Sequence, residues 1–92
     1  MGAIESSVIS TAVLSGWKYV GRGMSESNDG ATEKLHLPFP ECVAFCERVR
    51  VTKGEDWNGI EWFPSQQLCQ CNKDDRGHNS AKPYSSWMHF RV

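Results

Sequence analysis

The segments ECVAFC at residues 41–46 and LCQC at residues 68–71 contain all four cysteines of the chain, and their spacing decides the fold. The cysteines of the first segment are four residues apart, and side chains at this spacing share one face of a helix. Those of the second segment are two residues apart, and side chains at this spacing share one face of a strand. The two segments therefore predict a helix that packs on a sheet, with two sulfurs on each of the facing surfaces.

The first segment also carries the helical period of the chain. Pro40 suits a first helical turn, where its missing N–H is not needed, and Gly54 marks the end of the pattern. The sequence predicts a helix over residues 40–52, which is the only helix we expect. Its apolar positions are Cys42, Val43, Cys46 and Val49.

Short alternating stretches elsewhere predict strands. Residues 25–32 are rich in turn formers, and residues 1–16 are small and polar with scattered aliphatic side chains, so we expect an extended or poorly ordered N-terminal arm there. The expected fold class is α+β, with one helix packed on a small antiparallel β-sheet and stapled by two disulfides. The predicted strands are residues 17–20, 34–37, 59–63, 68–72 and 85–92.

The four sulfurs favour two disulfides that join helix to strand. Residues four apart on a helix have Cβ atoms about 5–6 Å apart, whereas a disulfide needs about 3.8 Å. Residues two apart on a strand are farther still, at about 6–7 Å. Two maps remain open: Cys42–Cys69 with Cys46–Cys71, or Cys42–Cys71 with Cys46–Cys69. Each bridge would close a loop of about 25–30 residues and stabilise the fold by about 3–4 kcal/mol.

A small zinc-binding domain is the alternative interpretation of the cysteines. Zinc sites usually present Cys-x-x-Cys on tight turns, and the spacings in this chain differ from that pattern. The disulfide interpretation leaves no metal ligands, and it places the protein outside the cell or in another oxidising lumen.

Composition excludes several function classes. The chain of 92 residues has a net charge of −1 and no basic stripe, which argues against nucleic-acid binding. No stretch approaches the roughly 20 apolar residues of a membrane span. No catalytic motif or cofactor-binding motif is present, so we expect a protein that is not an enzyme and needs no cofactor. His36 and His89 fall in alternating patterns, which predict surface or partly buried strand positions.

Residues 17–92 resemble the PAN/apple-like domain family. The resemblance rests on the helical pair Cys42 and Cys46, on the strand GIEW at residues 59–62 and on Cys69 in the hairpin. WKYVGRG at residues 17–23 is similar to the opening strand of that family, and WMHF could supply the closing strand. The chain departs from the family pattern in that Cys71 supplies a sulfur that many members carry before the middle strand. The resemblance implies the first disulfide map, because it joins the first helical cysteine to the hairpin cysteine.

The resemblance also implies an extracellular recognition or adhesion module that binds carbohydrate or protein without catalysis. Exposed aromatic and polar side chains are the candidates for ligand contact, because aromatic rings stack on sugars and anchor partner proteins. The candidate residues are Trp57, Trp62, Arg76, His78 and Tyr84. The alternative function is a structural subunit of an extracellular or lumenal assembly, which would associate through the N-terminal arm.

Overall fold

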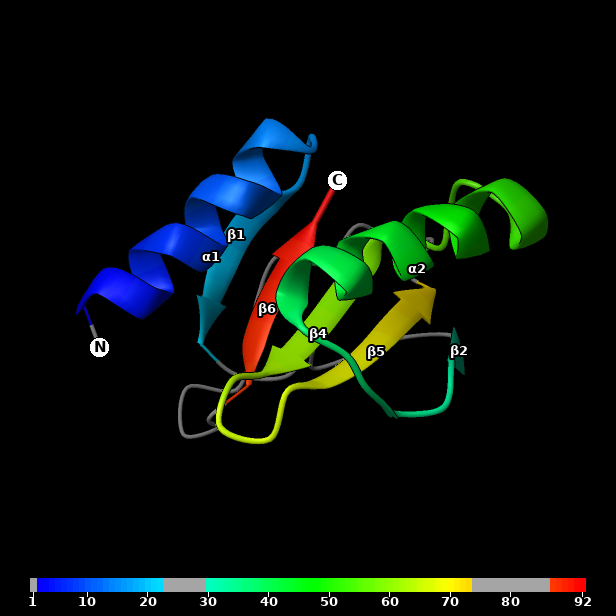
Figure 1. Cartoon of the computed structure of the whole chain (residues 1–92). Helices are drawn as coiled ribbons and strands as arrows, with labels where there is room; N and C mark the ends of the chain where they lie inside the picture. The colour runs from blue at the N-terminus through cyan, green and yellow to red at the C-terminus, as the bar shows by residue number, and fades with distance from the viewer. Residues whose placement is uncertain (1, 23–29, 74–86) are drawn as a thin grey trace.

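The computed structural model describes residues 2–22, 30–73 and 87–92. Two helices, α1 (Gly2–Leu14) and α2 (Phe39–Lys53), pack on one face of an antiparallel sheet (Figure 1). The predicted α+β class is therefore confirmed, but the expectation of a single helix is wrong. The strands are β1 (Lys18–Arg22), β2 (Gly30–Ala31), β3 (Leu35–His36), β4 (Gly59–Phe63), β5 (Leu68–Lys73) and β6 (Met88–Arg91).

The sheet has the strand order β1-β6-β4-β5-β2, and β3 also pairs with β5. The central strand β4 is antiparallel to β5 on one side and to β6 on the other, with Trp62 opposite both Cys69 and Met88. β1 joins β6 through a bulge between Tyr19 and Gly21. The strand β2 lies inside the segment that the sequence predicted as a turn cluster, and its two residues pair with the end of β5.

The helix α2 forms where the sequence predicted it, with bounds one residue wider at each end. Pro40 lies in its first turn, and Gly54 ends it by donating its N–H to the carbonyl of Arg50 at 3.0 Å. Its buried side chains recur at helical spacing and face the sheet. They are Phe39, Cys42, Val43, Cys46 and Val49.

The predicted N-terminal arm is instead the helix α1. Val8 and Ala12 are buried in the same core as α2, and Ile9 packs against that core. The helix ends in a Schellman motif, in which the N–H of Trp17 bonds to the carbonyl of Ala12 at 2.8 Å and that of Gly16 bonds to Val13 at 3.0 Å. Gly16 adopts the left-handed conformation that this motif requires, with φ of 89°. The prediction of an extended arm failed because serines and a threonine interrupt the apolar pattern, and packing outweighs their low propensity.

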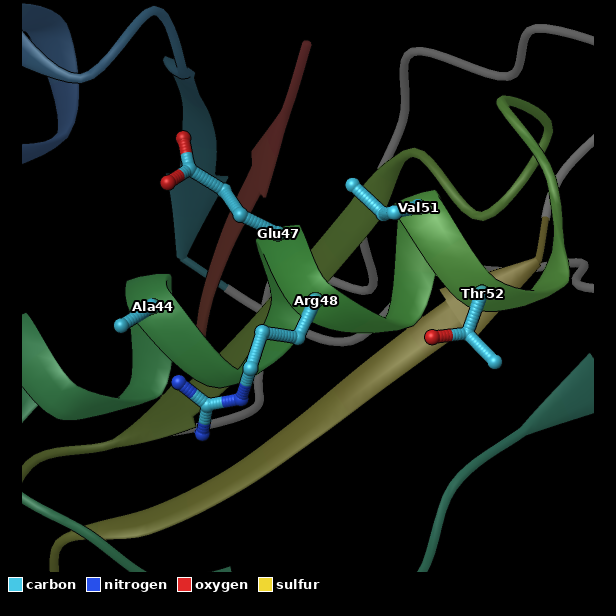
Figure 2. A pocket seen from close by; sticks show the side chains of 5 residues that line it. All are labelled: Ala44, Glu47, Arg48, Val51 and Thr52. Atoms are coloured by element: carbon cyan, nitrogen blue, oxygen red, sulfur yellow. The ribbon is translucent and has the colours of Figure 1, made fainter.

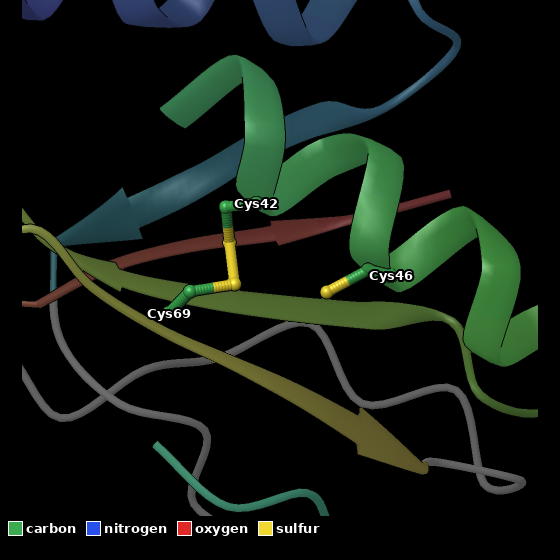
Figure 3. Close-up of side chains that lie close together, drawn as sticks. All are labelled: Cys42, Cys46 and Cys69. Atoms are coloured by element: carbon green, nitrogen blue, oxygen red, sulfur yellow. A yellow bond between two sulfur atoms is a disulfide. The ribbon is translucent and has the colours of Figure 1, made fainter. Parts of the chain in front are cut away.

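The two disulfides join Cys42 to Cys69 and Cys46 to Cys71, so the map implied by the family resemblance is confirmed and the crossed map is wrong. Their Cα atoms lie 5.6 and 5.5 Å apart, and Figure 3 shows the first bridge running from α2 down to β5. All four cysteines are almost completely buried. The bridges therefore fix the register of α2 on the sheet from inside the core.

Candidate ligand-binding surface

The disulfides remove the basis for the zinc alternative. The sulfurs of Cys42, Cys46 and Cys69 lie within 4.8 Å of one another, a grouping that could in principle hold a metal ion. A metal binds the thiolate form of cysteine, and every cysteine of this chain is already bonded to another. The clustering of these sulfurs therefore follows from two neighbouring bridges.

The structure describes two of the predicted ligand residues, Trp57 and Trp62, and places them near opposite ends of β4. Trp62 is 4% exposed, and its indole N–H donates to the carbonyl of Leu37 at 2.9 Å, so it belongs to the core. Trp57 is partly buried at the other end of β4, where the ammonium of Lys53 lies 5.3 Å from its ring centroid. Because Trp62 is enclosed, only Trp57 of this pair offers surface to a ligand. Arg76, His78 and Tyr84 lie outside the described residues.

A different aromatic cluster forms where β4 ends and β6 begins. The rings of Phe63 and Trp87 stack with centroids 5.3 Å apart and an interplanar angle of 22°. The ammonium of Lys34 lies 5.4 Å from the Trp87 centroid, a cation–π arrangement. Pairing of β4 with β6 places Trp62 opposite Met88, and this register brings the next residue of β4 beside the residue that precedes β6.

Phe63 also lines a surface depression with Arg22, Pro64 and Ser65, which we call the Phe63 hollow. Its volume is about 290 Å³, just below the range of about 300–1,000 Å³ for small-ligand sites, so it suits a ligand group of small size. The hollow combines an aromatic ring, guanidinium donors and a hydroxyl group. An aromatic face accepts C–H groups of a sugar ring, while the polar groups bond its hydroxyls. Sequence reasoning missed it because Phe63 and Arg22 come from strands that are distant in the chain.

Helix α1 fixes the arginine of this hollow. Arg22 Nη2 lies 3.2 Å from Glu5 Oε1, and the hydroxyl of Tyr19 donates to Glu5 Oε2 at 3.2 Å. The bulge in β1 places Tyr19 opposite Phe90 and Arg22 opposite Met88, so both side chains face the same side of the sheet. Burial raises the pKa of Tyr19 above its usual 10.0, and the hydrogen bond to the carboxylate raises it further. The arginine is therefore oriented before any ligand arrives.

A polar pair lies on the opposite face of the sheet from α2. Glu61 and His89 are directly opposite each other on β4 and β6, with His89 Nδ1 3.7 Å from Glu61 Oε2. Both side chains are fully buried, as is Asn72 on β5. The prediction that His89 is a surface or partly buried strand residue is therefore wrong, because it is fully buried. At 3.7 Å the two groups are beyond hydrogen-bond distance from each other, and their burial closes them to a substrate in this structure.

No protein-family model, curated protein or solved structure matches this chain. Among the described residues, no helix has the length and apolar character needed to cross a membrane.

Proposed function

We propose that the chain is a non-catalytic recognition module of the PAN/apple-like type that binds one sugar unit of a glycan in the Phe63 hollow. The observation that carries the proposal is the meeting of Phe63, Arg22 and Ser65 around one depression of about 290 Å³. A ring face and converging hydrogen-bonding groups are what a sugar needs, since its two faces are apolar and its rim is polar. The disulfides fix β5 to α2, and β5 pairs along its length with β4, the strand that carries Phe63, so little ordering entropy is lost on binding.

The proposed location is the extracellular space or another oxidising lumen. Two buried disulfides support this location, because they persist where thiols are not kept reduced. Recognition without catalysis is supported by the burial of the Glu61–His89 pair, the only close carboxylate–imidazole pair found in the described part of the chain.

The first experiment is a glycan array with the oxidised protein. The glycan that binds best is then titrated into the wild-type protein and into the variant Phe63→Ala, and the two affinities are compared. Loss of the stacking ring should weaken binding by about tenfold. Phe45→Ala is the matched control, because Phe45 is a partly buried aromatic residue of α2 outside the hollow. Near-ultraviolet circular dichroism verifies that both variants fold. Equal affinity of the two variants, or no glycan bound by the wild-type protein, would contradict the proposal.

A structural subunit remains the second candidate, because large apolar side chains are exposed on the helices. Val13 is 59% exposed, Leu14 is 89% exposed and Val51 is 88% exposed. The hypothesis that subunits associate through an extended N-terminal arm loses its basis, since residues 2–14 form the helix α1. Sedimentation of the native protein distinguishes a module of one or two copies from a subunit that polymerises.

A further inference from the structure

The outer face of α2 carries a second depression, with a volume of about 570 Å³ (Figure 2). Val51 lies at one end of the depression with 88% of its surface exposed, and the small side chain of Ala44 lies two turns of α2 before it. Glu47 and Arg48 lie between them. We call this surface the α2 outer face, which consists of Ala44, Glu47, Arg48, Val51 and Thr52.

The charges of this face are available to a partner. Within the described residues, Arg48 makes no hydrogen bond and no ion pair, and its side chain is exposed. Glu47 is also exposed and uses one carboxylate oxygen, Oε2, to accept a hydrogen bond from the indole of Trp17 at 3.3 Å. Arg48 and one carboxylate oxygen of Glu47 are therefore open to a partner, and Figure 2 shows the two side chains pointing to opposite edges of α2.

The spacing of these residues is self-complementary. Along the sequence of α2, the point halfway between Glu47 and Arg48 is also the point halfway between Ala44 and Val51. If two copies of α2 lie antiparallel around a two-fold axis through this point, Glu47 of one copy faces Arg48 of the other, and Val51 faces Ala44. Every such contact occurs twice, as an isologous interface requires. A large side chain opposite a small one also lets the two helices approach closely.

We propose that the α2 outer face is a homodimer interface, formed by antiparallel pairing of α2 with α2 of a second copy of this chain. The two disulfides beneath α2 make the face rigid, so association orders few groups. A single helix pair buries less than the roughly 1,200 Å² of a standard interface, so the dimer is weak and depends on concentration. The sugar-binding proposal does not depend on this interface, because Phe63 lines a different depression.

Charge reversal tests the pairing directly. Arg48→Glu places two acids on the face of each copy, and Glu47→Arg places two bases there. Each variant alone should dimerise at least tenfold more weakly than the wild-type protein, because like charges then face each other across the axis. A one-to-one mixture of the two variants should associate again, since every acid then meets a base. Sedimentation equilibrium up to about 1 mM protein measures these affinities.

Two further variants complete the experiment. Lys18→Glu changes the charge as Arg48→Glu does, at an exposed position on β1, and should leave dimerisation unchanged. Val51→Lys should abolish the dimer in every combination. Thermal unfolding of each variant checks the fold, which matters for Glu47→Arg because it removes the acceptor of Trp17. A wild-type protein that stays monomeric, a mixture no more associated than its components, or a dimer that survives Val51→Lys would overturn the proposal.

Discussion

The tryptophans show how far single residues can be placed from sequence. Strand alternation predicts that Trp62 and Glu61 lie on opposite faces of β4, and they do. It does not predict whether either face is covered, because covering is set by segments that are remote in the chain. Trp62 is enclosed by α2, where it packs edge-on against Phe39 with centroids 5.2 Å apart. Glu61 and His89 are buried on the other face, so the described side chains of both faces are covered in this part of the sheet.

Replacement of Trp62 by phenylalanine should destabilise the fold by about 2 kcal/mol. The change deletes the indole N–H that bonds to Leu37 and leaves a void beside Phe39. Trp57→Phe should cost less, because Trp57 is only partly buried and its indole donates no hydrogen bond among the described residues. Denaturant unfolding followed by circular dichroism compares the two variants. An equal loss in both would show that the burial of Trp62 is not what stabilises this region.

Tyr19 makes the attachment of α1 dependent on pH. Its folded-state pKa lies above the unfolded value of about 10, chiefly because of burial and then because of the bond to Glu5. The stabilisation is therefore fully present below about pH 10 and is lost as the pH rises through the folded pKa. The free energy of unfolding of the wild-type protein should fall over this alkaline range more steeply than that of Tyr19→Phe. Parallel curves for the two proteins would contradict this role.

At the scale of elements, the two helices differ in how strongly the sequence marks them. α2 has a proline in its first turn, a glycine after its end and an apolar period of five buried residues. In α1, fewer residues that are not exposed recur at helical spacing, namely Glu5, Val8, Ile9 and Ala12. Three serines and a threonine also lower the helix propensity of this segment. The glycine at position 16 was the available signal, because it follows this stripe where a helix C-terminus needs it. Packing on β1 supplies what local propensity lacks.

Gly16→Ala should therefore destabilise the protein by about 1 kcal/mol. A Cβ at this position would meet no atom within 4 Å, so the cost comes from the left-handed backbone conformation alone. Gly16→Asn should cost less, because asparagine tolerates this conformation better. Hydrogen exchange of the α1 amides locates the effect in the helix. Full stability in the alanine variant would show that the Schellman motif contributes little to holding α1.

For the whole molecule, cysteine spacing carried more information than any other pattern. It predicted that helix and sheet meet and that no bridge lies within either element, because local geometry forbids those bridges. It left the direction of α2 across β5 open, since both maps satisfy the same spacing. The aromatic hollow was beyond sequence reasoning for the same reason, as it depends on how β1, β6 and β4 are ordered in the sheet. The spacing of residues within one element specifies which side chains share a face, whereas a site built from several strands depends on the order of those strands in the sheet.

The two bridges should contribute nearly equal stability, and the fold should require at least one of them. They close chain separations of 27 and 25 residues, and the entropy of loop closure changes very little over this difference. Replacing either pair by alanine, as Cys42→Ala with Cys69→Ala or as Cys46→Ala with Cys71→Ala, should cost about 3–4 kcal/mol. A domain of this size has a total stability of about 5–10 kcal/mol, so each variant with one bridge should still fold.

The variant that lacks all four cysteines should be largely unfolded at 25 °C, even though its loss is less than additive. The two loops overlap, so the first bridge already restricts much of the chain that the second one closes. Guanidinium unfolding measures the free energy of unfolding of four proteins: the wild-type protein, the two single-bridge variants and the variant without cysteines. The wild-type protein is measured both oxidised and reduced. If one single-bridge variant unfolds while the other retains wild-type stability, native contacts around that sulfur pair, and not loop closure, hold α2 on the sheet.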